Sequence, residues 1–163
     1  MRHDFDVIIV GAGIAGSALA CALSSGFYAS TKGLRIALVE AHKISDTLPA
    51  RGGEVEGFDT RVSALTRASI DYFEKLGVWS AMTALRSCPF VGMQVWDARG
   101  TGEIKFNAQA MGVDYLGHIV ENRVITAALM SAVRQQRVEI LDGCAVSSIV
   151  LPTAGQSEQA AGG

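Results

Sequence analysis

The chain has 163 residues, 49% of them hydrophobic and 18% charged, which is enough for one globular domain with a core of its own. Sixteen acidic and fourteen basic residues give a net charge of −2. This balance, without any block of like charge, excludes the basic surface of a nucleic-acid-binding protein. Three cysteines and three histidines are scattered without paired or metal-ligand spacing, so neither a disulfide framework nor a metal site is predicted.

An uncharged stretch runs from Val7 to Thr31. A stretch of this length is also typical of a signal peptide or a membrane span. The residues before it argue against both, because Asp4 and Asp6 outnumber the single base Arg2, whereas a signal peptide begins with net positive charge. We therefore expect a central parallel strand at 5–10, buried on both faces, that turns into a buried helix, in a cytoplasmic protein.

Three glycines follow the first predicted strand with the spacing G-x-G-x-x-G. Gly11 allows a tight turn, Gly13 lets a pyrophosphate approach the backbone, and Gly16 allows close packing of the helix on the strand. A helix over 14–23 and a second strand over 34–39 complete a strand–helix–strand unit. The sequence therefore predicts a dinucleotide-binding unit, and the alternative is that the glycines serve packing alone.

The second strand is followed by Glu40, which is placed to accept hydrogen bonds from a ribose diol. The N-terminus of the predicted helix offers free N–H groups to phosphates. The motif alone does not separate FAD from NAD. The absence of an immediate second strand–helix crossover favours a flavin. The predicted dinucleotide contacts of this unit are Gly11, Ala12, Gly13, Ile14, Ala15, Gly16 and Glu40.

The middle of the chain is predicted to be a long polar loop, a helix and a hairpin. The loop covers 41–62, and the helix covers 66–76 and ends at Gly77. Two strands at 93–96 and 103–106 flank a turn rich in glycine and aspartate, which is the pattern of a β-hairpin.

The last third of the chain is predicted to contain one helix and two strands. Asn122 is suited to cap a helix that extends to about residue 135. Two short strands at 138–141 and 145–151 follow, with a turn between them. The segment 152–163 has no periodicity, and we expect it to be a disordered tail.

The chain resembles the FAD-dependent hydroxylases of ubiquinone biosynthesis, which are flavin monooxygenases of the para-hydroxybenzoate hydroxylase type. The resemblance covers residues 6 to about 130, and the V-W-D and G-H-I-V-E-N segments are its most specific parts. The matching segments, in chain order, are D-V-I-I-V-G-A-G (6–13), T-R-V-S-A-L (60–65), L-G-V-W (76–79), M-Q-V-W-D (93–97) and L-G-H-I-V-E-N (116–122).

The resemblance implies three further cofactor contacts, each with a structural alternative. Arg61 matches an arginine near the FAD and the active-site entrance, and the alternative is an exposed loop arginine or an ion pair. Asn122 matches an amide beside the flavin, and the alternative is a helix N-cap. Val146 matches a position whose backbone holds the adenine, and the alternative is a core valine. His118 is interpreted as a satisfied structural histidine, and no catalytic residue is assigned.

The resemblance implies an α/β fold, with a Rossmann-like FAD-binding domain over 1–151. Residues of about 90–118 would contribute to an incomplete, β-rich substrate domain. The implied whole enzyme hydroxylates the aromatic ring of a prenylated phenol, a ubiquinone precursor, with bound FAD, NAD(P)H and O₂. The family's later cofactor-binding segments have no counterpart here, so we expect a fragment that is inactive alone.

Three questions stay open at this point. The first is peripheral contact with the inner membrane or with a quinone-biosynthesis complex. The second is whether the chain is part of another FAD- or NAD-dependent oxidoreductase, because a fold does not fix a function. The third is whether it is a truncated, non-catalytic dinucleotide-binding module.

Overall fold

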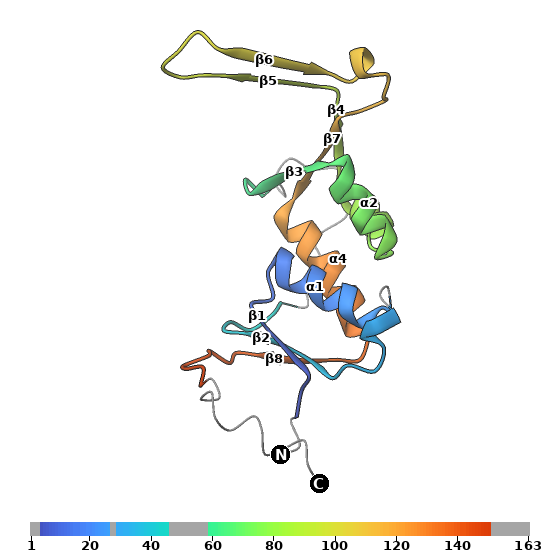
Figure 1. Ribbon diagram of the computed structural model, residues 1–163, viewed down its shortest axis with the longest axis vertical. Coiled ribbons are helices and arrows are strands. Elements are labelled where there is room, and N and C mark those ends of the chain that lie inside the picture. The colour runs from blue at the N-terminus through green and yellow to red at the C-terminus, as the bar shows by residue number, and fades with distance from the viewer. Residues whose placement is uncertain (1–3, 27–28, 46–58, 151–163) are drawn as a thin grey trace.

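The computed structural model describes residues 4–26, 29–45 and 59–150, arranged as an elongated stack of two sheets and a hairpin (Figure 1). The elements in chain order are β1 (Val7–Val10), α1 (Ile14–Ser24), the short 3-10 helix η1 (Ala29–Thr31), β2 (Ile36–Glu40), β3 (Val62–Thr66), α2 (Arg67–Lys75), α3 (Trp79–Leu85), β4 (Cys88–Phe90), β5 (Gly92–Trp96), β6 (Glu103–Asn107), the 3-10 helix η3 (Gln109–Met111), β7 (Gly117–Glu121), α4 (Asn122–Arg134) and β8 (Val138–Asp142).

The first sheet is parallel and has the strand order β1-β2-β8. Strands β1 and β2 are joined through α1, as the glycine motif predicts. Helices α1 and α4 lie side by side over one face of this sheet (Figure 1). The middle strand β2 is buried from Ile36 to Val39, and Leu38 and the α4 residues Ile125 and Leu129 are fully buried. This packing holds the carboxyl ends of β1 and β2 next to the start of α1.

The prediction that the first strand is central and buried on both faces is wrong. Strand β1 lies at the edge of the sheet, and its residues alternate between the core and the surface. Ile9 faces the core with 7% exposure, whereas Ile8 and Val10 are 59% and 61% exposed. The apolar run is therefore more hydrophobic than its position in the described structure requires.

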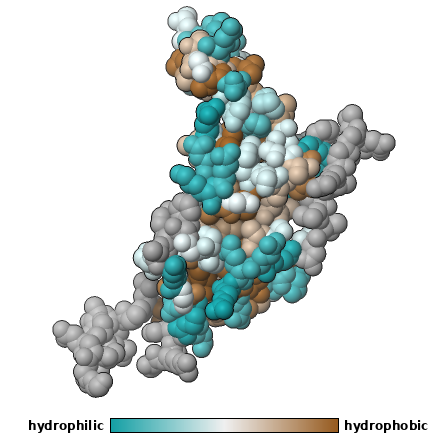
Figure 2. All heavy atoms as spheres, turned by 90° about the vertical axis from the view of Figure 1, so that its right-hand side faces the viewer, coloured by the Kyte–Doolittle hydropathy of each residue, from teal (hydrophilic) through white to brown (hydrophobic). Residues whose placement is uncertain are grey.

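The second sheet is antiparallel, with the order β3-β7-β4, and the β5–β6 hairpin extends beyond it (Figure 1). The predicted hairpin is confirmed, since β5 pairs with β6 and the N–H of Asp97 donates to the carbonyl of Gly102 at 2.9 Å. All ten hairpin residues in these strands are exposed. Four of them, paired across the strands, are large and apolar: Met93, Val95, Ile104 and Phe106. Hydrophobic atoms are accordingly visible at the hairpin end of the molecule in Figure 2.

The predicted helix after the polar loop is confirmed as α2. Its N-cap is Thr66, whose hydroxyl accepts a hydrogen bond from the N–H of Ser69 at 3.4 Å. It ends at Lys75, and Gly77 follows the C-cap Leu76 with a φ of +73°, which favours glycine. Helix α3 was not predicted, and it packs on α2 and α4 through the fully buried Met82.

The last third of the chain needs two corrections. Residues 144–150 form no regular element, so the strand predicted at 145–151 is absent as far as residue 150, and residue 151 lies outside the described part. Asn122 is not a capping residue, because the N-cap of α4 is Glu121 and Asn122 is its first helical residue. The other strand is confirmed as β8, which pairs in parallel with β2.

The predicted loop at 41–62 is only partly described. Residues 41–45 and 59–61 have no helix or strand, but Val62 already begins β3. The remainder of the predicted loop and the predicted tail at 152–163 lie outside the described residues. No helix in the described part of the chain is long and apolar enough to cross a membrane.

Candidate functional site

The glycine loop connects the end of β1 to the start of α1, and its three glycines have different surroundings. Gly11 has a φ of +99°, which is strained for any residue with a side chain. A Cβ on Gly16 would lie 1.9 Å from the carbonyl oxygen of Gly11, so only glycine allows this approach. A Cβ on Gly13 would meet no heavy atom within 4 Å. Gly13 therefore leaves open space at the N-terminus of α1, where free N–H groups attract anions.

Glu40 lies at the end of β2 beside this loop. Its carboxylate accepts hydrogen bonds from the N–H of Ala12 at 2.8 Å and from the N–H of His42 at 3.1 Å. The hydrogen bond from Ala12 contributes most, and together the two hydrogen bonds hold the pKa of Glu40 below its ordinary value. The carboxylate is therefore charged at neutral pH and remains an acceptor next to the open space at Gly13.

A cavity of about 630 Å³ opens at this point between the glycine loop, the segment after β2 and α4. Gly13, Glu40 and the 42–45 segment form one wall. The other wall is one stripe of α4, at the i, i+3, i+4 spacing of a helix face: Arg123, Thr126, Ala127, Met130, Ser131 and Arg134. The cavity has the size of a cofactor pocket and carries basic groups along both walls.

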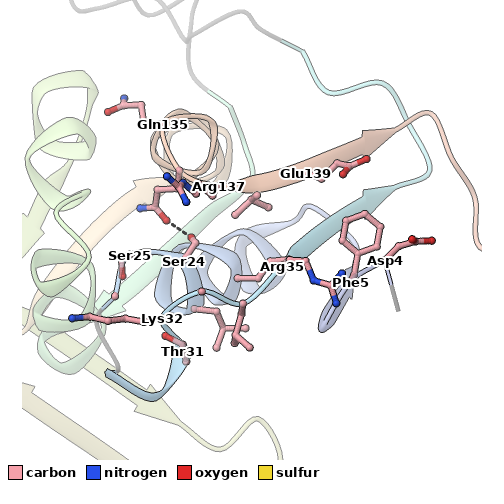
Figure 3. Close-up of a pocket in the computed structure, with 17 residues that line it drawn as sticks. Asp4, Phe5, Ser24, Ser25, Thr31, Lys32, Arg35, Gln135, Arg137 and Glu139 are labelled. Carbon is pink, nitrogen blue, oxygen red and sulfur yellow. Dashed lines mark hydrogen bonds between the residues drawn. The ribbon is translucent and has the colours of Figure 1, made fainter. Parts of the chain in front are cut away.

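A larger hollow of about 930 Å³ lies at the opposite end of the strands (Figure 3). It is lined by the C-terminal end of α1, including Ser24, and by the start of β2, including Arg35. Ser24 hydrogen-bonds with Gln136 across it. Ligands of parallel sheets bind at the carboxyl ends of the strands, and helix C-termini repel phosphate. The smaller cavity is therefore the better dinucleotide site.

Arg61 and Asn122 are neighbours, but neither lines the cavity beside Gly13. The N–H of Asn122 donates to the carbonyl of Arg61 at 2.9 Å, and its side-chain oxygen accepts from the Ser63 hydroxyl at 2.6 Å. The Arg61 side chain is 82% exposed and lies 3.9 Å from Asp59. The two residues are brought together at the junction of β3 and α4.

Val146 lies in the irregular segment after β8 and is 45% exposed, so the alternative of a core valine is wrong. The segment begins close to Glu40, because the N–H of Cys144 donates to the Glu40 carbonyl at 3.0 Å. Val146 follows two residues after this contact with the end of β2, although it does not line the cavity.

A buried carboxylate connects the second sheet to the cavity. Glu121, at the end of β7, is only 4% exposed. It accepts from Arg123 Nε at 2.7 Å, from the N–H of Asp59 at 2.9 Å and from Arg86 Nη1 at 3.0 Å. Burial raises the pKa of Glu121, but the Asp59 N–H and the two guanidinium groups outweigh it and hold the pKa below its ordinary value.

The sequence interpretation missed the α4 stripe and the Glu121 cluster. The stripe has a signal, since polar residues recur at helical spacing opposite the apolar face of Val124, Ile125, Ala128, Leu129 and Val133. The sequence gives no signal for the burial of Glu121, because a glutamate before a helix is normally an exposed residue. His118 was expected to be satisfied, but its Nδ1 is buried without a hydrogen-bond partner among the described residues.

Comparison with known proteins gives sequence relatives but no matching family model. The chain is 39% identical over 127 residues to the "Ubiquinone biosynthesis monooxygenase COQ6, mitochondrial" of Xenopus tropicalis, covering 77% of this chain and 25% of that protein. It is 31% identical over 131 residues to the "3-demethoxyubiquinol 3-hydroxylase" of Escherichia coli K12, covering 78% and 29%. The chain thus spans about a quarter of the length of these relatives.

Solved structures share the fold at low sequence identity. The "probable FAD-dependent monooxygenase" PqsL of Pseudomonas aeruginosa superposes with a TM-score of 0.58 at 20% identity, over 85% of this chain and 33% of that one. The p-nitrophenol 4-monooxygenase PnpA of Pseudomonas putida gives a TM-score of 0.59 at 17% identity, over 88% and 33%. These matches show a mixed α/β fold of the kind found in such monooxygenases. Over the part that it spans, the chain is therefore a relative of the ubiquinone-biosynthesis monooxygenases, in agreement with its sequence motifs.

Proposed function

We propose that this chain is the FAD-binding part of a flavin-dependent monooxygenase that hydroxylates the aromatic ring of a prenylated ubiquinone precursor. The observation that carries the proposal is the open space at Gly13, with a charged carboxylate, Glu40, on one side and the N-terminus of α1 on the other. The sequence relatives support the class of reaction.

The residues of the cavity fit the adenosine diphosphate half of FAD. The N–H groups at the start of α1 suit the pyrophosphate, since no side chain intervenes at Gly13. Glu40 is an acceptor for the ribose hydroxyl groups. The segment after β8, which contains Val146, begins beside the end of β2, and the adenine would lie there. Ala12, Ile14 and Ala15 supply backbone around the phosphates, as Gly11 and Gly16 keep the loop tight.

Arg61 and Asn122 are proposed to contact the flavin end of the cofactor. The two are joined by a hydrogen bond at the start of α4, and the exposed Arg61 side chain is free to reach a ligand beyond its weak ion pair with Asp59. When bound, FAD supplies the redox chemistry with NAD(P)H as reductant and O₂ as the oxygen source. The chain's own residues bind and orient the cofactor.

We propose a Rossmann-like FAD-binding domain over 1–151, to which the β1-β2-β8 sheet belongs. Residues of about 90–118 are assigned to a β-rich substrate domain, and the exposed apolar side chains of the β5–β6 hairpin support a role in covering an apolar phenol. A prenylated substrate also favours a cytoplasmic enzyme with peripheral contact at the inner membrane or with a quinone-biosynthesis complex.

The proposal is tested by incubating the purified chain with FAD, removing free cofactor by desalting, and recording the visible spectrum. Retained flavin bands that are lost in Gly13→Asp support it. Gly102→Asp is the matched control, because a Cβ at Gly102 also meets nothing within 4 Å, but the residue lies in the hairpin turn. A colourless wild-type chain would argue against FAD binding by this part and favour a non-catalytic module.

The class of reaction needs a separate test. A chain extended to the length of the relatives should consume O₂ with NADH or NADPH, and a prenylated phenol should stimulate this consumption. Flavin binding together with O₂ consumption that no phenol stimulates would favour a different flavin oxidoreductase.

A further inference from the structure

We propose that Arg123 is a phosphate-binding residue of the cavity and that Glu121 is the positioning residue that holds it there. The proposal rests on the dinucleotide site proposed above and adds a side chain that the glycine motif does not contain. It is carried by the place of Arg123 relative to α1, by the fixed geometry of its guanidinium group, and by the donors that remain free.

The place of Arg123 follows from the packing of α4 on α1. Ser17 Oγ contacts Met130 Sδ at 3.3 Å, and Ser24, further along α1, contacts Gln136 just after α4. The two helices therefore run in the same direction. One turn before the Ser17–Met130 contact, Gly13 is level with about residue 126 of α4, and two turns before the contact of Cys21 Sγ with the Leu129 carbonyl it is level with about residue 121. Arg123 lies between these two positions, level with the N-terminus of α1, and lines the same cavity as Gly13.

The guanidinium group of Arg123 is fixed by the buried carboxylate of Glu121. The Nε atom donates to Glu121 Oε2 at 2.7 Å, and Glu121 is itself held by Arg86 and by the N–H of Asp59. Holding an arginine at Nε restricts its rotation and fixes the direction of its remaining N–H groups. A basic group that is pre-positioned in this way loses less entropy when it binds an anion.

The donors needed for a phosphate remain available. Among the described residues, the Nη atoms of Arg123 have no hydrogen-bond partner, and the side chain is 38% exposed at the cavity. Both the N-terminus of α1 and this guanidinium group present positive charge to the same space. A diphosphate placed at Gly13 would therefore receive backbone N–H groups from one side and an arginine fork from the other.

Arg86 provides an internal control. It shares the partner of Arg123, with Arg86 Nη1 3.0 Å from Glu121 Oε1, but it does not line the cavity. If Arg123 serves only to stabilise Glu121, then removing either arginine should have similar consequences. If Arg123 binds phosphate, its removal should weaken a phosphorylated ligand much more than the removal of Arg86 does.

The experiment measures the affinities of ADP, adenosine and FAD by calorimetry for the wild-type chain, Arg123→Gln and Arg86→Gln. Arg123→Gln should weaken ADP and FAD by about tenfold and reduce the salt dependence of their affinities, because one charge-assisted contact is lost. The affinity for adenosine, which has no phosphate, should stay within about twofold. Arg86→Gln should lower the melting temperature and, because Arg86 reaches the cavity only through Glu121, weaken ADP much less than Arg123→Gln does.

Two further variants test the positioning role and protect against a folding defect. Arg123→Lys keeps the charge, but a lysine ammonium group lacks the planar guanidinium donors that can bind Glu121 and a phosphate at the same time. It should therefore recover only part of the ADP affinity. Glu121→Gln should weaken ADP, and adding Arg123→Gln to it should then cost less than in the wild-type background. Equal costs in both backgrounds would exclude positioning by Glu121.

The outcomes separate this inference from the proposed function. FAD binding that Arg123→Gln does not change would overturn the inference and leave the FAD site standing. ADP binding that depends on Arg123, without any FAD binding, would support the inference and contradict the flavin assignment. A chain that binds neither ADP nor FAD would overturn both.

Discussion

The carboxylate of Glu40 accepts a hydrogen bond from the backbone N–H of Ala12 at 2.8 Å, which joins the end of β2 to the glycine loop after β1. One acidic side chain thus has two uses. It fixes the loop that opens at Gly13, and it places negative charge where a ribose would lie. The loop geometry and the candidate binding site therefore depend on the same residue.

Glu40→Gln should weaken this connection. The loss of charged hydrogen bonds is expected to lower the free energy of unfolding by about 1 kcal/mol at pH 7, and FAD affinity should fall at the same time. The matched control is Glu139→Gln, an exposed glutamate on β8, which should change neither quantity. Chemical unfolding and equilibrium dialysis measure the two effects. Unchanged stability together with unchanged affinity would contradict the role given to Glu40.

Gly16→Ala should destabilise the chain. The added Cβ would lie 1.9 Å from the carbonyl oxygen of Gly11, and this backbone atom can move only if the loop moves. The expected cost is about 3 kcal/mol, at the upper end of the range for overpacking. Gly102→Ala, where a Cβ meets nothing, should cost less than about 1 kcal/mol. A Gly16→Ala chain with wild-type unfolding would show that the close helix–strand approach is not required.

Glu121 should contribute to the acid sensitivity of the fold. Its pKa is lower in the folded chain than in the unfolded one, so its stabilisation is fully present above about pH 4.3, the ordinary glutamate value. The stabilisation is lost as the pH falls through the lower, folded pKa. Glu121→Gln should cost roughly 3 to 5 kcal/mol at pH 7, because it leaves two arginines without their carboxylate.

The measurement for Glu121 is the free energy of unfolding from pH 7 to pH 3. The curve of Glu121→Gln should fall less steeply below about pH 4.3 than the wild-type curve. Glu74→Gln, which changes an exposed glutamate on α2, should keep the wild-type slope. Parallel curves for wild type and Glu121→Gln would contradict the lowered pKa.

His118 should have the opposite kind of effect, because its neutral form is favoured. Its ring lies edge-on to Trp79 at 5.1 Å and to Tyr115 at 4.8 Å, and burial lowers its pKa. The unfolded chain takes up a proton near pH 6.5, so the folded state loses stability as the pH falls below about 6.5.

His118→Phe keeps the edge-on packing and removes the unpartnered Nδ1. It should leave the free energy of unfolding at pH 7 unchanged or raise it by up to about 1 kcal/mol, and it should flatten the loss of stability between pH 7 and pH 5. Unfolding curves at several pH values measure both effects. A clear loss of stability at pH 7 would indicate that Nδ1 has a partner.

The glycine loop could be predicted from sequence because each glycine answers a local requirement. The positive φ of Gly11 and the close approach at Gly16 involve residues within a few positions of one another. The edge position of β1 could not be predicted in this way. Strand order is set by contacts between distant segments, and an apolar run such as V-I-I-V fits a central strand as well as an edge strand.

The same limit explains the errors after β8 and at α4. Residues 145–150 contain the β-branched residues Val146, Ile149 and Val150, which are typical of a strand, but in the described structure no neighbouring strand pairs with them. Asparagine is a residue type that often caps helices. The side chain of Asn122 instead accepts a hydrogen bond from the hydroxyl of Ser63, which is 59 positions away in the chain. The importance of Arg123 also depends on packing, since only the contact of α4 with α1 brings it beside Gly13.

Binding of FAD at the Gly13 cavity is tested most directly by an equilibrium dialysis titration of the purified chain with FAD and, separately, with FMN. We propose that the cavity at Gly13 and Glu40 holds the adenosine diphosphate half of FAD, and FMN lacks the adenosine and one of the two phosphates of this half. We expect saturable binding of one FAD per chain, competition by ADP, and binding of FMN at least about tenfold weaker, because FMN cannot make the contacts of the adenosine. Equal affinities for FAD and FMN, or FAD binding that ADP does not reduce, would contradict the assignment of this site.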